Sequence, residues 1–279
     1  MKQSTFLCGL IGAGIQLSRS PALHEREADE QGLRYIYKLI DLDKLGVAVE
    51  ALPELLNAAK QMGFAGLNIT YPCKQAIIPL LDELSEDARA LNAVNTVVIR
   101  DGRMTGHNTD WSGFAEGFRR GLPDAKRDRV VLLGAGGAGA AVAHAALTLG
   151  VRELTIFDLD ATRSAELAAK LGARVKAGSD LAAAMNAADG LIHCTPTGMA
   201  KMPGMPLDAG LLNAKHWVAE IVYFPMETEL LRVACAKGCR TVDGGGMMVF
   251  QAVGAFRLFT GIEPDAERMR RHFLSIDGE

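Results

Sequence analysis

The sequence VVLLGAGGAG at residues 130–139 combines a strand with a glycine-rich turn. Its four apolar residues, two of them β-branched, are typical of a strand buried on both faces of a parallel sheet. Gly134, Gly136 and Gly139 then fit the pattern G-x-G-x-x-G, and the alanine-rich residues 138–149 predict the following helix. Such glycines permit a tight turn, close approach of a pyrophosphate and close helix–strand packing. The N-terminus of the helix would bind the phosphates through its N–H groups and dipole.

The segment after this helix strengthens the interpretation. Residues 154–157 predict the next strand, and Asp158 follows it, 19 residues after Gly139. A carboxylate at this place can bind the ribose hydroxyls of a dinucleotide. The alternative is a structural turn in which Asp158 only caps a helix, and we favour the dinucleotide. The expected cofactor-binding residues here are Gly134, Ala135, Gly136, Gly137, Ala138, Gly139 and Asp158.

The second half of the chain alternates strands with helices. The predicted strands are residues 130–133, 154–157, 190–194, 217–222 and 240–242. This alternation predicts a doubly wound parallel sheet. Thr195 and Tyr223 each follow one of these strands, so both are expected at the carboxyl edge of the sheet. Because a cofactor would pass along that edge, Thr195 is a further candidate for binding it.

Length and composition limit the class of protein. The 279 residues suffice for two domains, and 49% hydrophobic with 23% charged residues is typical of a globular protein. A net charge of −3 gives no general attraction to nucleic acid or to an anionic membrane. No apolar run reaches the roughly 18 residues of a membrane span, so we expect a cytoplasmic protein. Five scattered cysteines indicate reduced thiols, and no metal site is expected.

Two hydroxyl residues precede the first predicted helix. Residues 6–11 predict a strand, and Pro21 occupies the place of a first helical residue. The spacing alone favours Ser20 as the N-cap of this helix. Ser18 has no such structural role, and two hydroxyls at a helix start can bind a carboxylate.

The sequence NITYPCK at residues 68–74 places polar side chains at the end of a strand. Pro72 ends that strand, so Lys74 is expected at a strand-to-helix corner. A lone lysine at such a corner is normally a solvated charge. Its neighbours Asn68 and Thr70 favour a function, because the three side chains can converge on one small polar ligand.

A predicted hairpin leads to a second polar motif. Residues 93–100 and 103–107 are typical of two strands around an Asp-Gly turn. The sequence NTD at residues 108–110 then opens an amphipathic helix. Asp110 can serve merely as a favourable charge at the helix N-terminus. The motif is nonetheless dense in polar groups for a turn between apolar elements.

These motifs occur together in the shikimate dehydrogenase superfamily, which the chain resembles over essentially its full length. Within it the chain is most similar to the quinate/shikimate dehydrogenases. The resemblance is carried by SRSP (18–21), NITYPCK (68–74), AVNT (93–96), NTD (108–110), GAGGAG (134–139), TGM (197–199), YFPMET (223–228) and GMMVFQ (246–251). Many short motifs in the correct order are far more specific than any one of them.

The resemblance implies roles for individual residues. Ser18 and Ser20 would bind the substrate carboxylate, which replaces the cap-only interpretation of Ser20. Lys74 and Asp110 would be the catalytic acid/base pair beside the hydroxyl that is oxidised. Gly246 would join the cofactor-binding residues. The remaining substrate-binding residues would be Thr70, Asn95 and Gln251 for the ring hydroxyls, with Tyr223 lining the pocket.

The resemblance also implies an α/β fold with two domains. Residues 1–110 would form an α/β substrate domain, and residues 111–243 a Rossmann-type doubly wound parallel sheet. Residues 244–279 would be C-terminal helices that return to the first domain. The implied reaction is reversible hydride transfer between shikimate, giving 3-dehydroshikimate, and NAD(P). The expected partner is this small-molecule substrate. The oligomeric state stays open, and a homodimer is one possibility.

Two departures from the family pattern bear on specificity. Family members that prefer NADP carry Asn-Arg-Thr after the second strand of the nucleotide domain, where this chain has Asp158-Leu159-Asp160. We therefore expect NAD as the preferred cofactor and NADP as the weaker one. Enzymes that accept quinate well can have threonine at the second carboxylate-binding position, where this chain has Ser20. Shikimate is therefore the expected substrate, with a catabolic quinate dehydrogenase as the alternative.

Two further functions compete with this interpretation. Methylenetetrahydrofolate dehydrogenase has a similar two-domain plan and a lysine near its substrate. The ordered set of Ser18, Asn95 and Asp110 argues against it. A non-enzymatic NAD sensor would need a module that binds DNA or a partner, and the sequence has no basic recognition helix. A pure sensor would also have no use for both Lys74 and Asp110.

Overall fold

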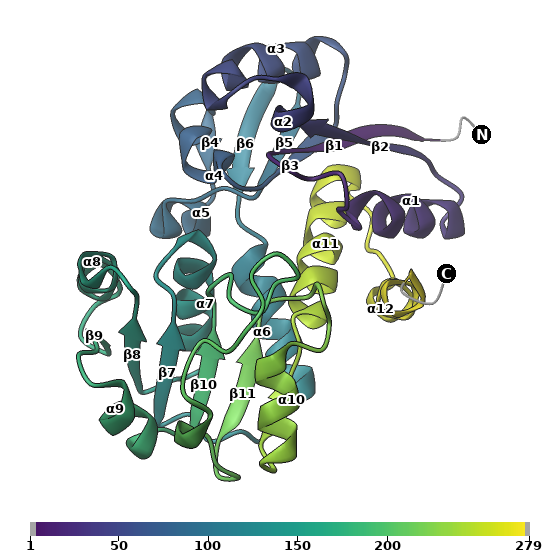
Figure 1. Ribbon diagram of the computed structural model, residues 1–279. Coiled ribbons are helices and arrows are strands. Elements are labelled where there is room, and N and C mark those ends of the chain that lie inside the picture. The colour runs from purple at the N-terminus through teal and green to yellow at the C-terminus, as the bar shows by residue number, and fades with distance from the viewer. Residues whose placement is uncertain (1–3, 277–279) are drawn as a thin grey trace. The chain divides into compact units, whose positions relative to one another are not determined.

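The computed structural model describes residues 4–276 of the chain (Figure 1). These residues divide into two compact units. Unit 1 contains the N-terminal part up to Thr109 together with the C-terminal part from Val249, and unit 2 is Asp110–Met248. The C-terminal helices thus return to the first unit. Among residues 4–276, no helix has the length and apolar character needed to cross a membrane.

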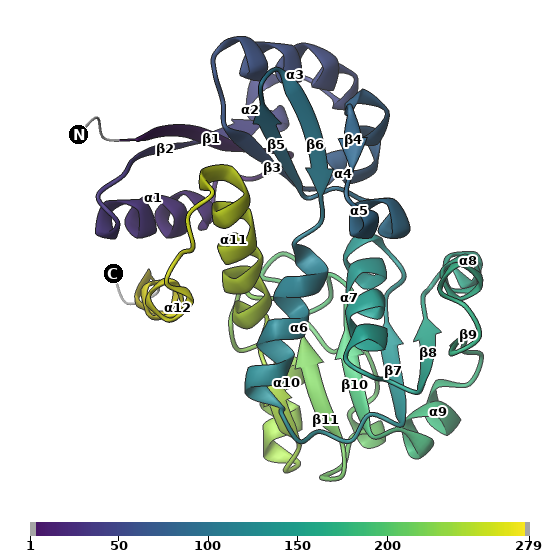
Figure 2. The ribbon, with the colours of Figure 1, turned by 180° about the vertical axis from the view of Figure 1, so that it is seen from behind.

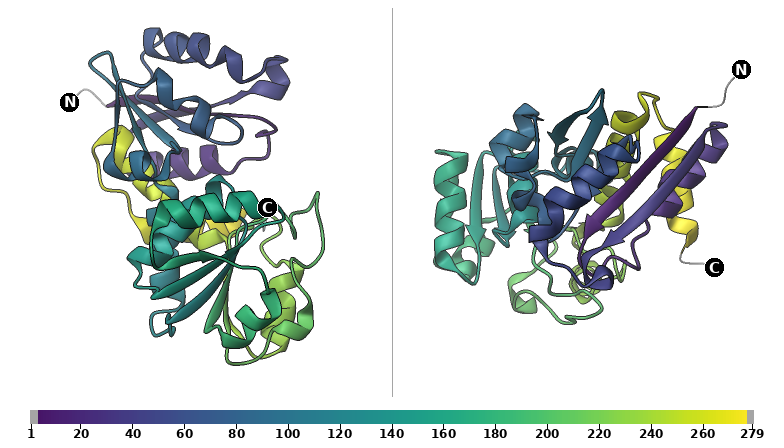
Figure 3. Two further views of the ribbon diagram at one scale, coloured as in Figure 1. Left: turned by 90° about the vertical axis from the view of Figure 1, so that its left-hand side faces the viewer. Right: turned by 90° about the horizontal axis from the view of Figure 1, so that it is seen from above.

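Unit 2 contains a six-stranded sheet in which every pair of neighbouring strands is parallel. Its strands are β7 (Arg129–Leu133), β8 (Glu153–Phe157), β9 (Val175–Ala177), β10 (Gly190–His193), β11 (Trp217–Glu220) and β12 (Arg240–Val242). In the order β12-β11-β10-β7-β8-β9, the chain builds the sheet first from β7 towards β9 and then from β10 towards β12 on the other side of β7. The carboxyl ends of β7 and β10 are therefore the topological switch point. The predicted doubly wound sheet is confirmed, and its twist is visible in Figure 3.

Helices cover both faces of this sheet. They are α6 (Asp110–Gly121), α7 (Gly137–Thr148), α8 (Ala161–Leu171), α9 (Leu181–Ala187) and α10 (Glu229–Ala236). Val130 and Leu132 pack in the core with α6 and α7, in front of the sheet in Figure 2, whereas Val131 and Leu133 pack with α9 and α10. Alternate side chains of a strand point to opposite faces, so a strand covered on both faces must be apolar throughout.

Unit 1 contains a mixed sheet of the order β2-β1-β3-β5-β6-β4. Its strands are β1 (Thr5–Gly12), β2 (Arg34–Asp41), β3 (Gly66–Ile69), β4 (Glu83–Leu84), β5 (Thr96–Arg100) and β6 (Arg103–His107). The pairs β1–β2, β1–β3 and β4–β6 are parallel, and β3–β5 and β5–β6 are antiparallel. Asp101 and Gly102 join β5 to β6 with φ of 51° and 74°, the backbone of a tight hairpin turn. The predicted hairpin is confirmed.

Short helices connect and cover the strands of unit 1. They are α1 (Ser20–Glu30), α2 (Leu42–Leu45), α3 (Leu52–Gln61), α4 (Cys73–Ala76) and α5 (Glu86–Leu91). Leu56 and Ala59 of α3 pack with Leu67 and Ile69 of β3 in one apolar core. This core fixes the end of β3, from which the NITYPCK motif emerges.

The C-terminal helices are α11 (Gly245–Thr260) and α12 (Ala266–Ser275). Phe256 and Phe259 of α11 pack with Tyr35 and Tyr37 of β2 in a second core of unit 1. Arg268 of α12 forms a bidentate ion pair with the fully buried Glu27 of α1, with contacts of 2.6 and 2.8 Å. These aromatic and ionic contacts attach the C-terminal part of the chain to unit 1.

Candidate functional sites

The glycine-rich turn lies between β7 and α7 in unit 2. Gly134 has φ of 102°, and a Cβ atom there would lie 2.8 Å from the carbonyl oxygen of Cys194. A Cβ atom at Gly139 would collide with the carbonyl oxygen of Gly134. By contrast, Cβ atoms at Gly136 and Gly137 would meet open space. The outer glycines are therefore needed for packing, and the inner two leave the N-terminus of α7 accessible to a ligand such as a phosphate.

Asp158 is joined directly to this turn. Its Oδ2 atom accepts a hydrogen bond of 2.7 Å from the Ala135 backbone N–H, and its Oδ1 atom accepts one of 3.0 Å from the Asp160 N–H. The N-cap of α8 is Asp160, which accepts from the N–H of Thr162. Asp158 is therefore not the helix cap of the alternative interpretation. Its carboxylate lies beside the turn, where a dinucleotide-binding site needs one.

Thr195 and Gly246 occupy different surroundings in unit 2. Strand β10 pairs with β7, so Thr195 lies beside the glycine-rich turn, with its Cγ2 atom 3.1 Å from a Cβ position at Gly134. Gly246 lies in the first turn of α11 and packs on Gly117 of α6, with its Cβ position 3.2 Å from the Gly117 Cα atom. Packing alone therefore accounts for a glycine at position 246.

The start of α1 differs from the sequence prediction. Helix α1 begins at Ser20, and Arg19 occupies the N-cap position without a capping side-chain bond. Ser20 is therefore not the N-cap, because the helix starts one residue before Pro21 and includes Ser20 in its first turn. The Oγ atom of Ser18 accepts from the Ser20 N–H at 3.3 Å. Ser18, expected to lack a structural role, thus stabilises the helix start.

A buried hydrogen-bond network links three motifs of unit 1. Asn68 donates to the carbonyl oxygen of Asn95 at 3.2 Å and to Thr96 Oγ1 at 3.1 Å. The side chain of Asn95 accepts from the Thr109 N–H at 2.7 Å and donates to Thr109 Oγ1 at 3.0 Å. The hydroxyl of Tyr37 donates to Asn68 Oδ1 at 2.8 Å. These bonds bring NITYPCK, AVNT and NTD together.

Tyr37 is a residue that the sequence prediction missed. It lies on β2, where a tyrosine among alternating apolar residues gives no local sign of a polar partner. Its side chain is 5% exposed, and burial raises its pKa well above the ordinary value, whereas a hydrogen bond with Ser20 lowers it. Tyr37 therefore forms hydrogen bonds with both Ser20 and Asn68.

Lys74 and Thr70 follow β3 in unit 1. Thr70 packs against Gly12, where a Cβ atom would collide with its methyl group. Lys74 lies in α4 with a half-buried side chain, and its carbonyl oxygen accepts from the Val94 N–H at 2.9 Å. The backbone thereby connects the lysine to the AVNT motif. The predicted strand-to-helix corner is confirmed.

The predicted substrate residues are divided between the two units. Unit 1 contains Ser18, Ser20, Thr70, Lys74, Asn95 and Gln251, the last in α11. Unit 2 contains Asp110 and Tyr223. Asp110 is 7% exposed and is the first residue of α6, and the half-buried Tyr223 follows β11.

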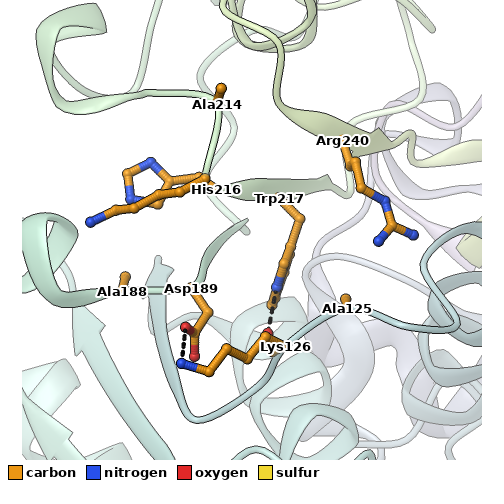
Figure 4. A pocket seen from close by; sticks show the side chains of 9 residues that line it. Ala125, Lys126, Ala188, Asp189, Ala214, His216, Trp217 and Arg240 are labelled. Atoms are coloured by element: carbon orange, nitrogen blue, oxygen red, sulfur yellow. Dashed lines mark hydrogen bonds and ion pairs between the residues drawn. The ribbon is translucent and has the colours of Figure 1, made fainter.

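A cavity of about 360 Å³ in unit 2 is formed by other residues (Figure 4). It is lined at the amino ends of the parallel strands by Ala125, Lys126, Ala188, Asp189, Ala214, Lys215, His216, Trp217 and Arg240. Its groups already bind one another, since Lys126 contacts Asp189 at 3.2 Å and Trp217 donates to the Lys126 carbonyl oxygen at 2.8 Å. None of them is a predicted site residue. Over residues 4–276, no group of three His, Cys, Asp or Glu side chains is arranged to hold a metal ion.

Three known family models match separate parts of the chain. The model described as shikimate dehydrogenase substrate binding domain matches residues 10–97. Residues 118–201 match shikimate / quinate 5-dehydrogenase, and residues 244–272 match shikimate 5'-dehydrogenase C-terminal domain. The three matches cover parts of both units.

Individual proteins match over nearly the full length. A shikimate dehydrogenase (NADP(+)) of Arthrobacter sp. is 58% identical over 99% of this chain and 96% of that protein. A quinate/shikimate dehydrogenase (NAD(+)) of Corynebacterium efficiens is 51% identical over 99% of this chain and 100% of that protein. The structure of quinate dehydrogenase from Corynebacterium glutamicum in complex with NAD has a TM-score of 0.92 at 50% identity, covering 98% and 100% of the two chains.

Proposed function

This chain belongs to the shikimate dehydrogenase family, and we propose that it oxidises shikimate reversibly to 3-dehydroshikimate with NAD(P). The observation that carries the proposal is the glycine-rich turn joined to Asp158, which suits a dinucleotide. The hydrogen-bonded motifs of unit 1 add side chains that suit a small polyhydroxylated acid.

The chemistry needs a group that moves a proton and groups that hold the substrate. Bound NAD(P) would supply or accept the hydride. Lys74 and Asp110 together remove the hydroxyl proton and return it in the reverse direction. Ser18 and Ser20 donate hydrogen bonds to the carboxylate. The ring contacts come from Thr70, Asn95 and Gln251, with Tyr223 lining the pocket.

The cofactor would bind at the carboxyl edge of the unit 2 sheet. The accessible N–H groups at Gly136 and Gly137 suit the pyrophosphate, since Cβ positions there face open space. Asp158 accepts from the ribose hydroxyls of NAD, whereas the additional phosphate of NADP would meet its negative charge. We therefore propose NAD as the preferred cofactor. We also propose that the protein works in the cytoplasm, because all of its described cysteines are free thiols.

Quinate dehydrogenase activity is the second candidate. The relative from Corynebacterium efficiens carries both substrates in its name, and the structure from Corynebacterium glutamicum is named for quinate alone. Quinate has a further hydroxyl on the carbon that bears the carboxylate, close to the position proposed for Ser20. Enzymes that accept quinate well can have threonine at this position, so Ser20 favours shikimate.

Initial rates decide among these functions. Shikimate and quinate are each assayed with NAD and with NADP, and tetrahydrofolate substrates serve as the control for the competing enzyme class. We expect the highest kcat/KM for shikimate with NAD. Activity with quinate alone would establish the second candidate, and no oxidation of either ring acid would refute the proposal.

A further inference from the structure

A buried histidine–glutamate pair lies at the carboxyl edge of the unit 2 sheet. His193 ends β10 and Glu220 ends β11, and the two residues are opposite each other in the parallel register. Both side chains are 0% exposed, and His193 Nδ1 lies 2.8 and 3.0 Å from the two carboxylate oxygens. Neither residue is among the site residues predicted from the sequence.

The contacts of Glu220 determine the role of His193 Nδ1. Glu220 also accepts from the N–H groups of Ile221 and Val222, at 2.9 and 3.0 Å, and from Thr228 Oγ1 at 3.1 Å. With this many donors around it, the carboxylate acts as an acceptor only. His193 Nδ1 therefore donates to Glu220, which fixes the orientation of the ring and leaves Nε2 for a second partner.

Thr195 is the partner of that second nitrogen. Its Oγ1 atom lies 2.5 Å from His193 Nε2, within hydrogen-bond distance of the ring. The same oxygen accepts from the Thr197 N–H at 3.3 Å. Two contacts thus hold the Thr195 hydroxyl in place beside the glycine-rich turn.

We propose that Glu220 and His193 position Thr195 for a hydrogen bond to the bound dinucleotide. NAD(P) offers hydrogen-bonding groups in its ribose hydroxyls and its carboxamide. Thr195 contacts the cofactor, whereas Glu220 and His193 act through it and are positioning residues. This inference rests on the proposed use of NAD(P) and adds to it two residues that fix the position of one contact.

The test measures NAD affinity by calorimetry together with kcat and KM. Thr195→Val removes the hydroxyl at nearly constant shape, and Thr195→Ser keeps it. His193→Asn keeps an N–H donor towards Glu220 but has no atom at the Nε2 position. We expect Thr195→Val and His193→Asn each to raise the Kd for NAD by about 10-fold, the value of one hydrogen bond. KM for NAD should rise in parallel, with a smaller change in kcat.

The double variant separates positioning from simple stabilisation. If His193 acts through Thr195, His193→Asn adds no further loss of affinity to Thr195→Val. Thr195→Ser should retain most of the wild-type affinity. His216→Asn is the matched control, since His216 is also buried in unit 2 but binds the Met185 carbonyl oxygen at the opposite edge of the sheet. It should lower Tm without changing the Kd for NAD.

Two results would overturn the inference. Wild-type affinity in Thr195→Val, or additive losses in the double variant, would show that the pair only stabilises the loop. Because Thr195 is half-buried, its two variants should fold even where His193→Asn does not. A wild-type protein that binds neither NAD nor NADP would instead refute the proposed function itself, and the inference with it.

Discussion

The Oδ2 atom of Asp158 accepts a hydrogen bond of 2.7 Å from the Ala135 backbone, which joins the end of β8 to the glycine-rich turn after β7. Asp160, rather than Asp158, caps the following helix. Leu159 between them is fully exposed. The Asp158 carboxylate is therefore held beside the glycine-rich turn, where we propose that the ribose of the dinucleotide binds.

Exchanging this charge should change the cofactor preference. For the wild type we expect kcat/KM to be about 100-fold higher with NAD than with NADP, because a lost hydrogen bond and a repulsion together cost a few kcal/mol. Asp158→Asn combined with Leu159→Arg should narrow or reverse this ratio. Arg163→Ala is the control, since Arg163 is the next cation along α8. A wild-type kcat/KM for NADP equal to or above that for NAD would contradict the prediction.

Removing the amine of Lys74 should affect the chemical step. Lys74→Ala should lower kcat by about 100-fold or more, the usual scale of general acid–base catalysis, with a smaller change in KM. Steady-state kinetics with shikimate measure both constants. Lys60→Ala, on the exposed side of α3, should leave them unchanged. Near-normal kcat in Lys74→Ala would exclude a catalytic role.

Ser18 allows binding and helix stabilisation to be separated. Ser18→Ala should raise KM for shikimate by about 10-fold, since a hydrogen bond to a charged acceptor contributes about 1.5–3 kcal/mol. The loss of its bond to the Ser20 N–H should also lower Tm slightly. Ser85→Ala removes a comparable bond, the cap of α5 to the Ala88 N–H, and should lower Tm alone. A lower Tm with unchanged KM in Ser18→Ala would assign Ser18 a structural role only.

His24 should make the stability of the protein depend on pH. The ring is fully buried among aromatic side chains of unit 1, and burial lowers its pKa from 6.5 to about 3. Above pH 6.5 the histidine is neutral in both the folded and the unfolded state. As pH falls from about 6.5 towards 3, only the unfolded state takes up the proton, so stability is lost.

At pH 5 this loss should amount to about 2 kcal/mol of unfolding free energy relative to pH 7.5. Urea unfolding at the two pH values measures it. His24→Phe should be less pH-dependent by that amount, because phenylalanine cannot be protonated. An equal pH dependence in the variant and the wild type would show that other groups are responsible.

Local sequence patterns predicted much of the fold. The apolar run of β7 and the glycine-rich turn predicted a strand covered on both faces and the helix after it. The Asp101-Gly102 pair predicted the hairpin of unit 1. Strand β9 was missed, because only Val175 of its three residues is buried and an edge strand needs no continuous apolar run. The predicted strand at 217–222 ends at Glu220, since the Val222 N–H donates to the Glu220 carboxylate.

The sequence by itself determined most of the elements, the order of the motifs and the family to which the chain belongs. Only the tertiary structure decided which distant side chains meet. Tyr37 and Asn68 are 31 positions apart, and His193 and Glu220 are 27 apart, yet each pair is in direct hydrogen-bond contact. Hydrophobic periodicity and helix capping are patterns among residues close together in the sequence, so they carry no information about such pairs. The register of the strands determines these contacts, directly between β10 and β11 and across β1 between β2 and β3.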